Sequence, residues 1–184
     1  MLHLKKIPVG IDTTIQALQK KLNNKLITTW GISDELYRCY GRCYRNQSAN
    51  GYVPEVFISD SVGYKDLFLD DNYAATSFFG VERMDINDDF RGEADVHLVF
   101  AVNLKQLKPS IRHRADEEVH QDVIKVFNKN GETKLNSIVV GIENVFREYT
   151  AWKDKDKGVM YRDMQPFHFF RINFRLKHIQ KSNC

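Results

Sequence analysis

Alternating apolar and polar residues mark two strands in the second half of the chain. Apolar residues recur at every second position from Ala94 to Val102, with Asp95 and His97 between them, and again from Phe170 to Leu176. A period of two is typical of a strand that is buried on one face. We therefore predict strands over 94–103 and 167–178. The alternating large residues of the second strand should face the core: Phe170, Ile172, Phe174 and Leu176.

Two segments show helical spacing instead. Residues 13–25 place their apolar side chains on one helical face, and Thr13 followed by Gln16 is a capping-box pattern. Residues 115–128 repeat valine and phenylalanine at helical spacing, with acidic residues in the first turn, where they complement the helix dipole. We expect an N-terminal helix and a central helix.

The remaining segments complete an α+β pattern. Residues 37–45 predict a strand, 52–58 its antiparallel partner, and 76–82 a further short strand. Residues 136–142 fit a helix or a strand, and 143–150 favour a helix. The fold class is α+β: an antiparallel β-sheet or sandwich packed with both helices and closed by the C-terminal strand.

A single domain over residues 1–184 is expected, because no linker-like stretch divides the chain. Two additions to it are predicted, an extended loop at about 60–80 and a short C-terminal tail after Ile179. The longest apolar runs are far shorter than the roughly 20 residues of a membrane span, so no membrane association is expected.

Charge is unevenly distributed along the chain. The net charge is only +3, but Asp60–Asp95 holds ten acidic and three basic residues, and the flanking regions are basic. One copy's acidic region could face a neighbour's basic region in a heterologous, ring-closing contact. A well-solvated surface is the alternative explanation.

The three cysteines, Cys39, Cys43 and Cys184, are too few and too scattered for a disulfide framework, and they fit a reducing compartment. In a strand, Cys39 and Cys43 would lie about 13 Å apart, beyond the roughly 7 Å Cα limit of a disulfide. We expect buried, reduced structural thiols. A basic and aromatic face made of Arg38, Tyr40, Arg42 and Tyr44 should lie opposite them. It could stack on single-stranded nucleic acid or pack across strands.

One arrangement could support hydrolysis. Glu93, Asp95 and His97 alternate onto one face of a predicted strand, a spacing that could hold a divalent metal for a hydrolase or nuclease. The simpler interpretation is the solvent-facing or subunit-facing side of a half-buried strand. Motifs of nucleophilic, nucleotide-binding and zinc-protease chemistry do not occur in the sequence. We therefore expect a non-enzymatic protein without catalytic residues, metal or other cofactor.

Several segments together resemble the neck or head-to-tail ring proteins of crAss-like phages, and more distantly tail-terminator and tail-completion proteins of tailed bacteriophages. The segments are GYVPEVF, DNYAATSFFGVERMDIND, ADVHLVFAVNLKQLKP, RADEEVHQDVIKVF, GIENVFREYT and DMQPFHFFRINFRLKH. The resemblance implies a structural virion protein, assembled in the bacterial host cytoplasm, that forms a ring of 6 or 12 copies. Its implied partners are the portal or adjacent neck and tail rings. Genomic DNA would pass through the central channel without sequence-specific contact.

Within such a ring, Phe167–His178 and Ala115–Asn128 would build the body, and Ala151–Gly158 would reach neighbouring subunits. The loop Tyr64–Phe79 should project and pack on an adjacent subunit or ring, although it could instead fold back on its own sheet. The expected interaction residues are Asp70, Asp71, Tyr73, Phe78, Phe79, Arg171 and Arg175.

Overall fold

A computed structural model describes residues 1–86, 91–127, 133–152 and 162–179. The elements, in chain order, are α1 (Ile11–Trp30), η1 (Asp34–Leu36), β1 (Tyr37–Arg42), β2 (Tyr44–Ser48), β3 (Gly51–Ser59), β4 (Gly63–Asp66), β5 (Ala75–Ile86), β6 (Arg91–Asn103), α2 (Leu104–Leu107), α3 (Asp116–Phe127), β7 (Thr133–Val140), α4 (Ile142–Val145), η2 (Thr150–Trp152) and β8 (Phe167–Ile179). The predicted α+β class is confirmed. None of the described helices is long and apolar enough to span a bilayer.

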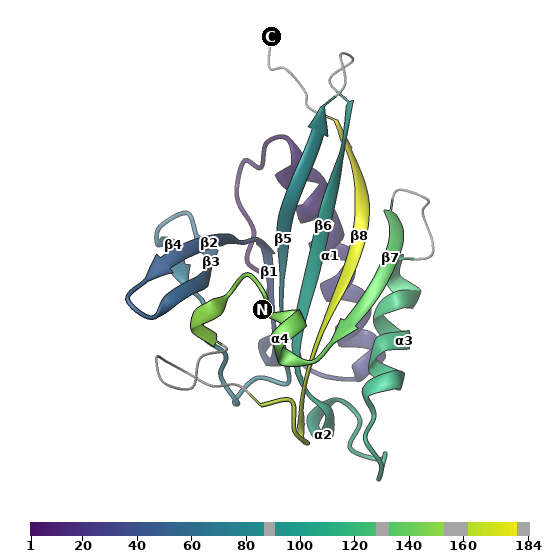
Figure 1. Cartoon of the computed structure of the whole chain (residues 1–184). Coiled ribbons are helices and arrows are strands. Elements are labelled where there is room, and N and C mark those ends of the chain that lie inside the picture. Colours follow the sequence, from purple (N-terminus) through teal and green to yellow (C-terminus); the bar gives the residue numbers. More distant parts are fainter. Residues whose placement is uncertain (87–90, 128–132, 153–161, 180–184) are drawn as a thin grey trace.

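A five-stranded sheet in the order β1-β5-β6-β8-β7 forms the centre of the molecule (Figure 1). β1 runs parallel to β5, and the other neighbouring strands are antiparallel. α1 and α3 pack on one face and bury the larger apolar core. The second face carries another core, to which the three-stranded sheet β2-β3-β4, α4 and η2 contribute. Both faces of the central strands are therefore covered.

The alternation in β6 and β8 positions the larger core. Leu98 is the partner of Ile172 and Phe100 the partner of Phe170, and these side chains are fully buried under the helices. Phe174 and Leu176 are buried in the same core. The prediction that the apolar face of the C-terminal strand lies in the core is confirmed.

The N-terminal helix is longer than predicted and starts differently. α1 begins at Ile11, so Thr13 and Gln16 form no capping box: Gln16 instead exchanges two hydrogen bonds with the backbone of Lys5. The helix ends at Trp30 and is capped by Gly31, whose left-handed φ of 64° suits glycine. Its buried positions include the predicted stripe of Ile15, Leu18, Leu22 and Leu26.

Residues 37–45, predicted as one strand, form two. β1 pairs in parallel with β5, whereas β2 pairs antiparallel with β3, so the expected partnership with residues 52–58 holds only for the second part. The change takes place at Cys43, whose N–H donates to the carbonyl oxygen of Phe79 at 2.7 Å. The larger sheet thus leads directly into the smaller one.

Other predicted boundaries also shift. The ambiguous segment 136–142 is largely strand, as part of β7, and the helix expected over 143–150 is limited to α4. The loop predicted over Tyr64–Phe79 is shorter, because β4 extends to Asp66 and β5 begins at Ala75. Residues 153–158 of the predicted charged loop, the tail after Ile179 and Cys184 lie outside the described residues.

Candidate functional site

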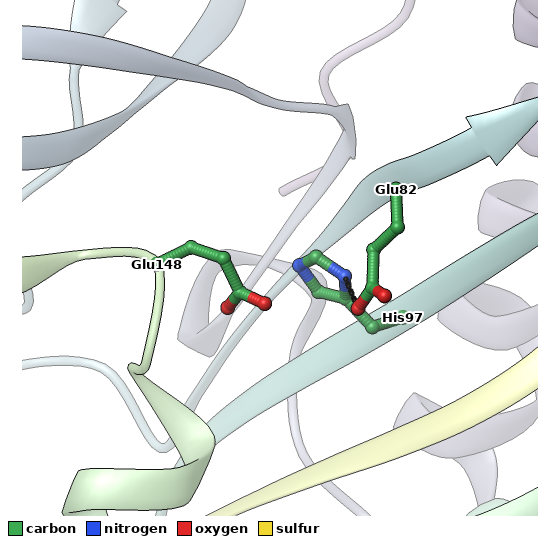
Figure 2. A group of neighbouring side chains, drawn as sticks. All are labelled: Glu82, His97 and Glu148. Atoms are coloured by element: carbon green, nitrogen blue, oxygen red, sulfur yellow. Dashed lines mark ion pairs between the residues drawn. The ribbon is translucent and has the colours of Figure 1, made fainter.

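Three ionisable side chains meet on the face of the large sheet opposite α1 and α3. Glu82 comes from β5, His97 from β6, and Glu148 from the segment that follows α4 (Figure 2). One potential ligand atom from each lies within 4.8 Å of the other two. Among the described residues, this is the group of three or more side chains whose geometry resembles a metal site.

His97 fits into this position because its cross-strand partner is a glycine. Gly80 lies directly opposite His97, and a Cβ atom at Gly80 would overlap the imidazole ring. The ring is buried, with Nδ1 3.2 Å from Oε1 of Glu82 and Nε2 3.4 Å from the hydroxyl of Tyr149. The glycine therefore allows an imidazole to lie flat across β5.

Two arginines already occupy the carboxylates of this cluster. Arg171 of β8 donates from Nη1 to Glu148 at 2.6 Å and from Nη2 to Glu82. Arg147 donates from Nη2 to Glu82 at 2.7 Å and from Nε to Glu148 at 2.5 Å. Each arginine thus bridges the two carboxylates, and hydrogen bonds between charged groups are among the stronger ones in proteins.

The electrostatics of the cluster follow from these contacts. The contact with His97, together with Arg171 and Arg147, lowers the pKa of Glu82 to about 2 against the opposing effect of burial. Burial would raise the pKa of Glu148, but hydrogen bonds from Arg171 and Arg147 lower it. Burial also lowers the pKa of His97, so the imidazole is neutral at pH 7. The negative charges of the two carboxylates are therefore matched by the positive charges of the two guanidinium groups.

A divalent cation at this place would have to displace a guanidinium group from at least one carboxylate. A metal site normally leaves its carboxylates free to bind the ion, and its outer hydrogen bonds orient the ligands rather than compete for them. Glu82, His97 and Glu148 are therefore best explained as a partly buried ion-pair network that joins β5, β6 and β8 to the segment after α4.

In the structure, the side chains of the candidate triad Glu93, Asp95 and His97 pair with different partners. The three residues do share one face of β6, as the alternation predicts. Glu93 and Asp95 pair with Arg175, at 3.5 and 3.1 Å, whereas His97 pairs with Glu82. They do not form one metal-binding group.

Three of the expected interaction residues are interior. Phe78 and Phe79 are 1% and 0% exposed and belong to β5, so the prediction that they project toward a neighbour is wrong. The reason is that β5 begins before them and has cores on both faces. Arg171, expected to contact a neighbouring subunit or ring, is 1% exposed, because the layer that contains Glu148 covers it.

The remaining interaction residues lie at the surface. Asp70 and Asp71 are exposed in the loop before β5, beside Phe68, which is 51% exposed. With Tyr73 and Met164, the two aspartates line a hollow of about 350 Å³. The guanidinium of Arg38 lies 4.2 Å from the centre of the Tyr73 ring. Arg175 is exposed and paired with Glu93 and Asp95.

The cysteine expectations are partly confirmed. Cys39 and Cys43 are buried and free. Cys39 belongs to the core beneath the helices and Cys43 to the core on the other face, so they do not share a face. The predicted face of Arg38, Tyr40, Arg42 and Tyr44 is likewise interrupted, since Tyr40 is buried and the strand changes at Cys43.

One edge of the large sheet is open within the described structure. The edge strand β1 is covered by residues 1–3, through a bridge from Leu2 to Cys39. At the opposite edge, no described strand pairs with the outer side of β7. Ile138 and Val140 on this strand are 37% and 50% exposed. Sequence analysis missed this edge, because it could not assign residues 136–142.

No family model matches the chain, and no curated protein matches its sequence.

Proposed function

We propose that the chain is a structural subunit of a ring in the head-to-tail region of a tailed bacteriophage, where it joins the portal to the tail around the DNA channel. The resemblance of its segments to neck and head-to-tail ring proteins supports this function. The structure supplies surfaces suited to subunit contact, and the charged cluster on the large sheet is already neutralised by its own arginines.

The open edge of β7 is the observation that carries the proposal. Unpaired backbone groups at a sheet edge readily pair with another chain, and natural proteins usually protect such edges. β7 instead presents Ile138 and Val140 to solvent beside this edge. A neighbouring subunit would cover both side chains and complete the sheet.

Exposed charged residues lie at both ends of the large sheet. Asp70 and Asp71 precede the end of the sheet where β5 begins. Lys134 and Lys177 are exposed near the opposite end, where β7 begins and β8 ends, and Lys125 is exposed near the end of α3. Contact between unlike ends of successive copies is heterologous, and such contacts generate closed rings when the rotation closes.

The partners of this ring would be further copies of the chain, 6 or 12 in number, and the portal or adjacent neck and tail rings. Genomic DNA would pass through the channel without sequence-specific contact. Asp70, Asp71 and Tyr73, with the hollow beside them, provide a surface for an adjacent subunit or ring.

Two matched variants test the role of the β7 edge. Val140→Lys places a charge at the open edge, whereas Val62→Lys changes a valine of similar exposure at the turn between β3 and β4. Sedimentation velocity of the full chain should show that Val140→Lys dissociates the oligomer and Val62→Lys preserves it. The proposed edge contact is wrong if the two variants sediment alike.

A further inference from the structure

A small cavity lies between the N-terminal segment, the first half of α1 and the end of β1. The residues that line it include His3, Lys5, Asp12, Gln19 and Gly41. Asp12 and Gln19 share one face of α1, because seven positions correspond to about two helical turns. About 10 Å³ of the cavity is open to the centre of a water molecule, which is roughly the room that one water needs. The cavity therefore suits a ligand of the size of one water.

The amide of Gln19 is fixed so that its oxygen faces β1. Gln19 is completely buried, and its Nε2 donates to the carbonyl oxygens of His3 and Cys39, both at 2.7 Å. These two bonds use both protons of the amide. On the other side, Oε1 is buried and accepts no hydrogen bond from any described residue. A Cβ atom at Gly41 would lie 3.1 Å from Oε1, so the oxygen points into the space beside this glycine.

Asp12 provides a second acceptor in the cavity. Its Oδ2 accepts from Nζ of Lys5, whereas Oδ1 is buried and has no hydrogen bond within the described structure. Nη1 of Arg42 lies 3.8 Å from Oδ1, which is too far for a direct hydrogen bond. Nε2 of His3 is likewise buried without a partner among the residues that the structure describes. Such atoms are costly to bury unpaired, and in folded proteins they normally bond to protein or water.

The charges around the cavity oppose an ion as its ligand. The carboxylate of Asp12 already faces two cations, Lys5 and Arg42, so a metal ion would add a third positive charge at the same place. An anion would face the carboxylate of Asp12 and the amide oxygen of Gln19, which can only accept hydrogen bonds. A neutral hydrogen-bond donor satisfies both oxygens, and the size of the cavity limits this donor to water.

We propose that this cavity binds one long-lived water molecule, which donates hydrogen bonds to Oε1 of Gln19 and Oδ1 of Asp12. Arg42, which also lines the cavity, supplies a donor for the oxygen of the water. The water fixes the amide of Gln19, whose Nε2 anchors His3 in the segment that covers the edge of β1. It thereby helps to keep this edge of the large sheet closed. This inference is independent of the proposed ring.

NMR of water–protein contacts in the unaltered chain tests the site without any substitution. We expect the Hα protons of Gly41 to show NOE and ROE cross-peaks of opposite sign with water, the signature of a water that tumbles with the protein. Gly63, at the start of β4, is the control, because no atom lies within 4 Å of the position of its missing Cβ. No water NOE at Gly41, or equal signals at both glycines, would overturn the proposal.

Oxygen-17 relaxation dispersion counts long-lived waters and does not respond to exchanging side-chain protons. Gly41→Ala should reduce its amplitude by that of one water, because the added methyl group would occupy the space beside Oε1 of Gln19. Alanine suits this backbone, since Gly41 is not among the glycines with positive φ. Ser61→Ala, at an exposed position between β3 and β4, is the control and should leave the amplitude unchanged. Equal amplitudes in the unaltered chain and folded Gly41→Ala would overturn the proposal.

A crystal structure of the unaltered chain at atomic resolution gives the most direct view of the site. We expect one water oxygen within about 3 Å of both Oε1 of Gln19 and Oδ1 of Asp12. A metal ion at this place, or a direct hydrogen bond from Arg42 to Oδ1 of Asp12 that closes the cavity, would overturn the proposal.

Discussion

Arg171 donates a hydrogen bond from Nη1 to Oε2 of Glu148 at 2.6 Å, from a guanidinium that is almost completely buried. Its second amino group donates to Glu82. A single side chain of β8 therefore bridges two carboxylates from different parts of the chain. This arrangement connects the large sheet to the layer that contains α4.

Arg171→Ala should be strongly destabilising. Removal of one partner of a buried ion pair leaves uncompensated charge and typically costs about 3–5 kcal/mol. Arg175→Ala is the matched control, because this neighbouring arginine of β8 pairs with Glu93 and Asp95 at the surface, and its loss should have a far smaller effect. Urea unfolding measures both, and equal losses would contradict the buried network.

The same network predicts loss of stability in acid. The pKa of Glu82 falls from its usual 4.5 to about 2 in the folded chain. As pH drops below about 4.5, the unfolded chain binds a proton at this residue before the folded chain does, so the free energy of unfolding falls until about pH 2. Glu82→Gln should reduce this slope, whereas Glu93→Gln should retain it. Urea unfolding at several pH values between 2 and 5 provides the comparison.

A third prediction concerns the close packing of His97 against Gly80. Gly80→Ala should cost about 1–3 kcal/mol, as overpacking usually does, since its Cβ would overlap the imidazole. In the background His97→Ala, the same change should be much less harmful, so the double-mutant cycle should show a favourable coupling. Additive effects in urea unfolding would show that the two residues do not constrain each other.

Cys39 and Cys43 should react slowly in the folded chain. Burial raises the pKa of Cys39 to about 11 and that of Cys43 to about 12, so neither forms the reactive thiolate at neutral pH. Iodoacetamide followed by peptide mass spectrometry should modify both only after unfolding. A mass two daltons low in the peptide that holds both residues would instead reveal a disulfide, contrary to their location in separate cores.

Sequence patterns predicted the parts of the fold that depend on local periodicity. The alternation in β6 and β8 correctly placed Phe170 and Ile172 in the core, and helical spacing located α1 and α3. The same alternation put Arg171 on the outer face, because a period of two separates two faces but does not show whether a second layer covers one of them. That layer forms through contacts distant in sequence, including the pairing of Arg171 with Glu148 and Glu82.

The candidate sites depended even more on distant contacts. Glu82, His97 and Glu148 come from three segments, and only His97 stood out in the sequence. The parallel pairing of β1 with β5 was missed for the same reason, since the nearer segment 52–58 offered a plausible hairpin partner. Phe78 and Phe79 were placed both in the predicted strand 76–82 and in the projecting loop 64–79, because the start of β5 has no alternating pattern: both of its faces are buried.

Native mass spectrometry of the full-length chain tests the proposed ring most directly. Heterologous contact through the open β7 edge predicts one closed species of 6 or 12 copies, reached without larger open assemblies. A protein that remains monomeric over the accessible concentration range would contradict the account. A dimer that grows no further would contradict it equally, since two β7 edges would then be pairing across a twofold axis.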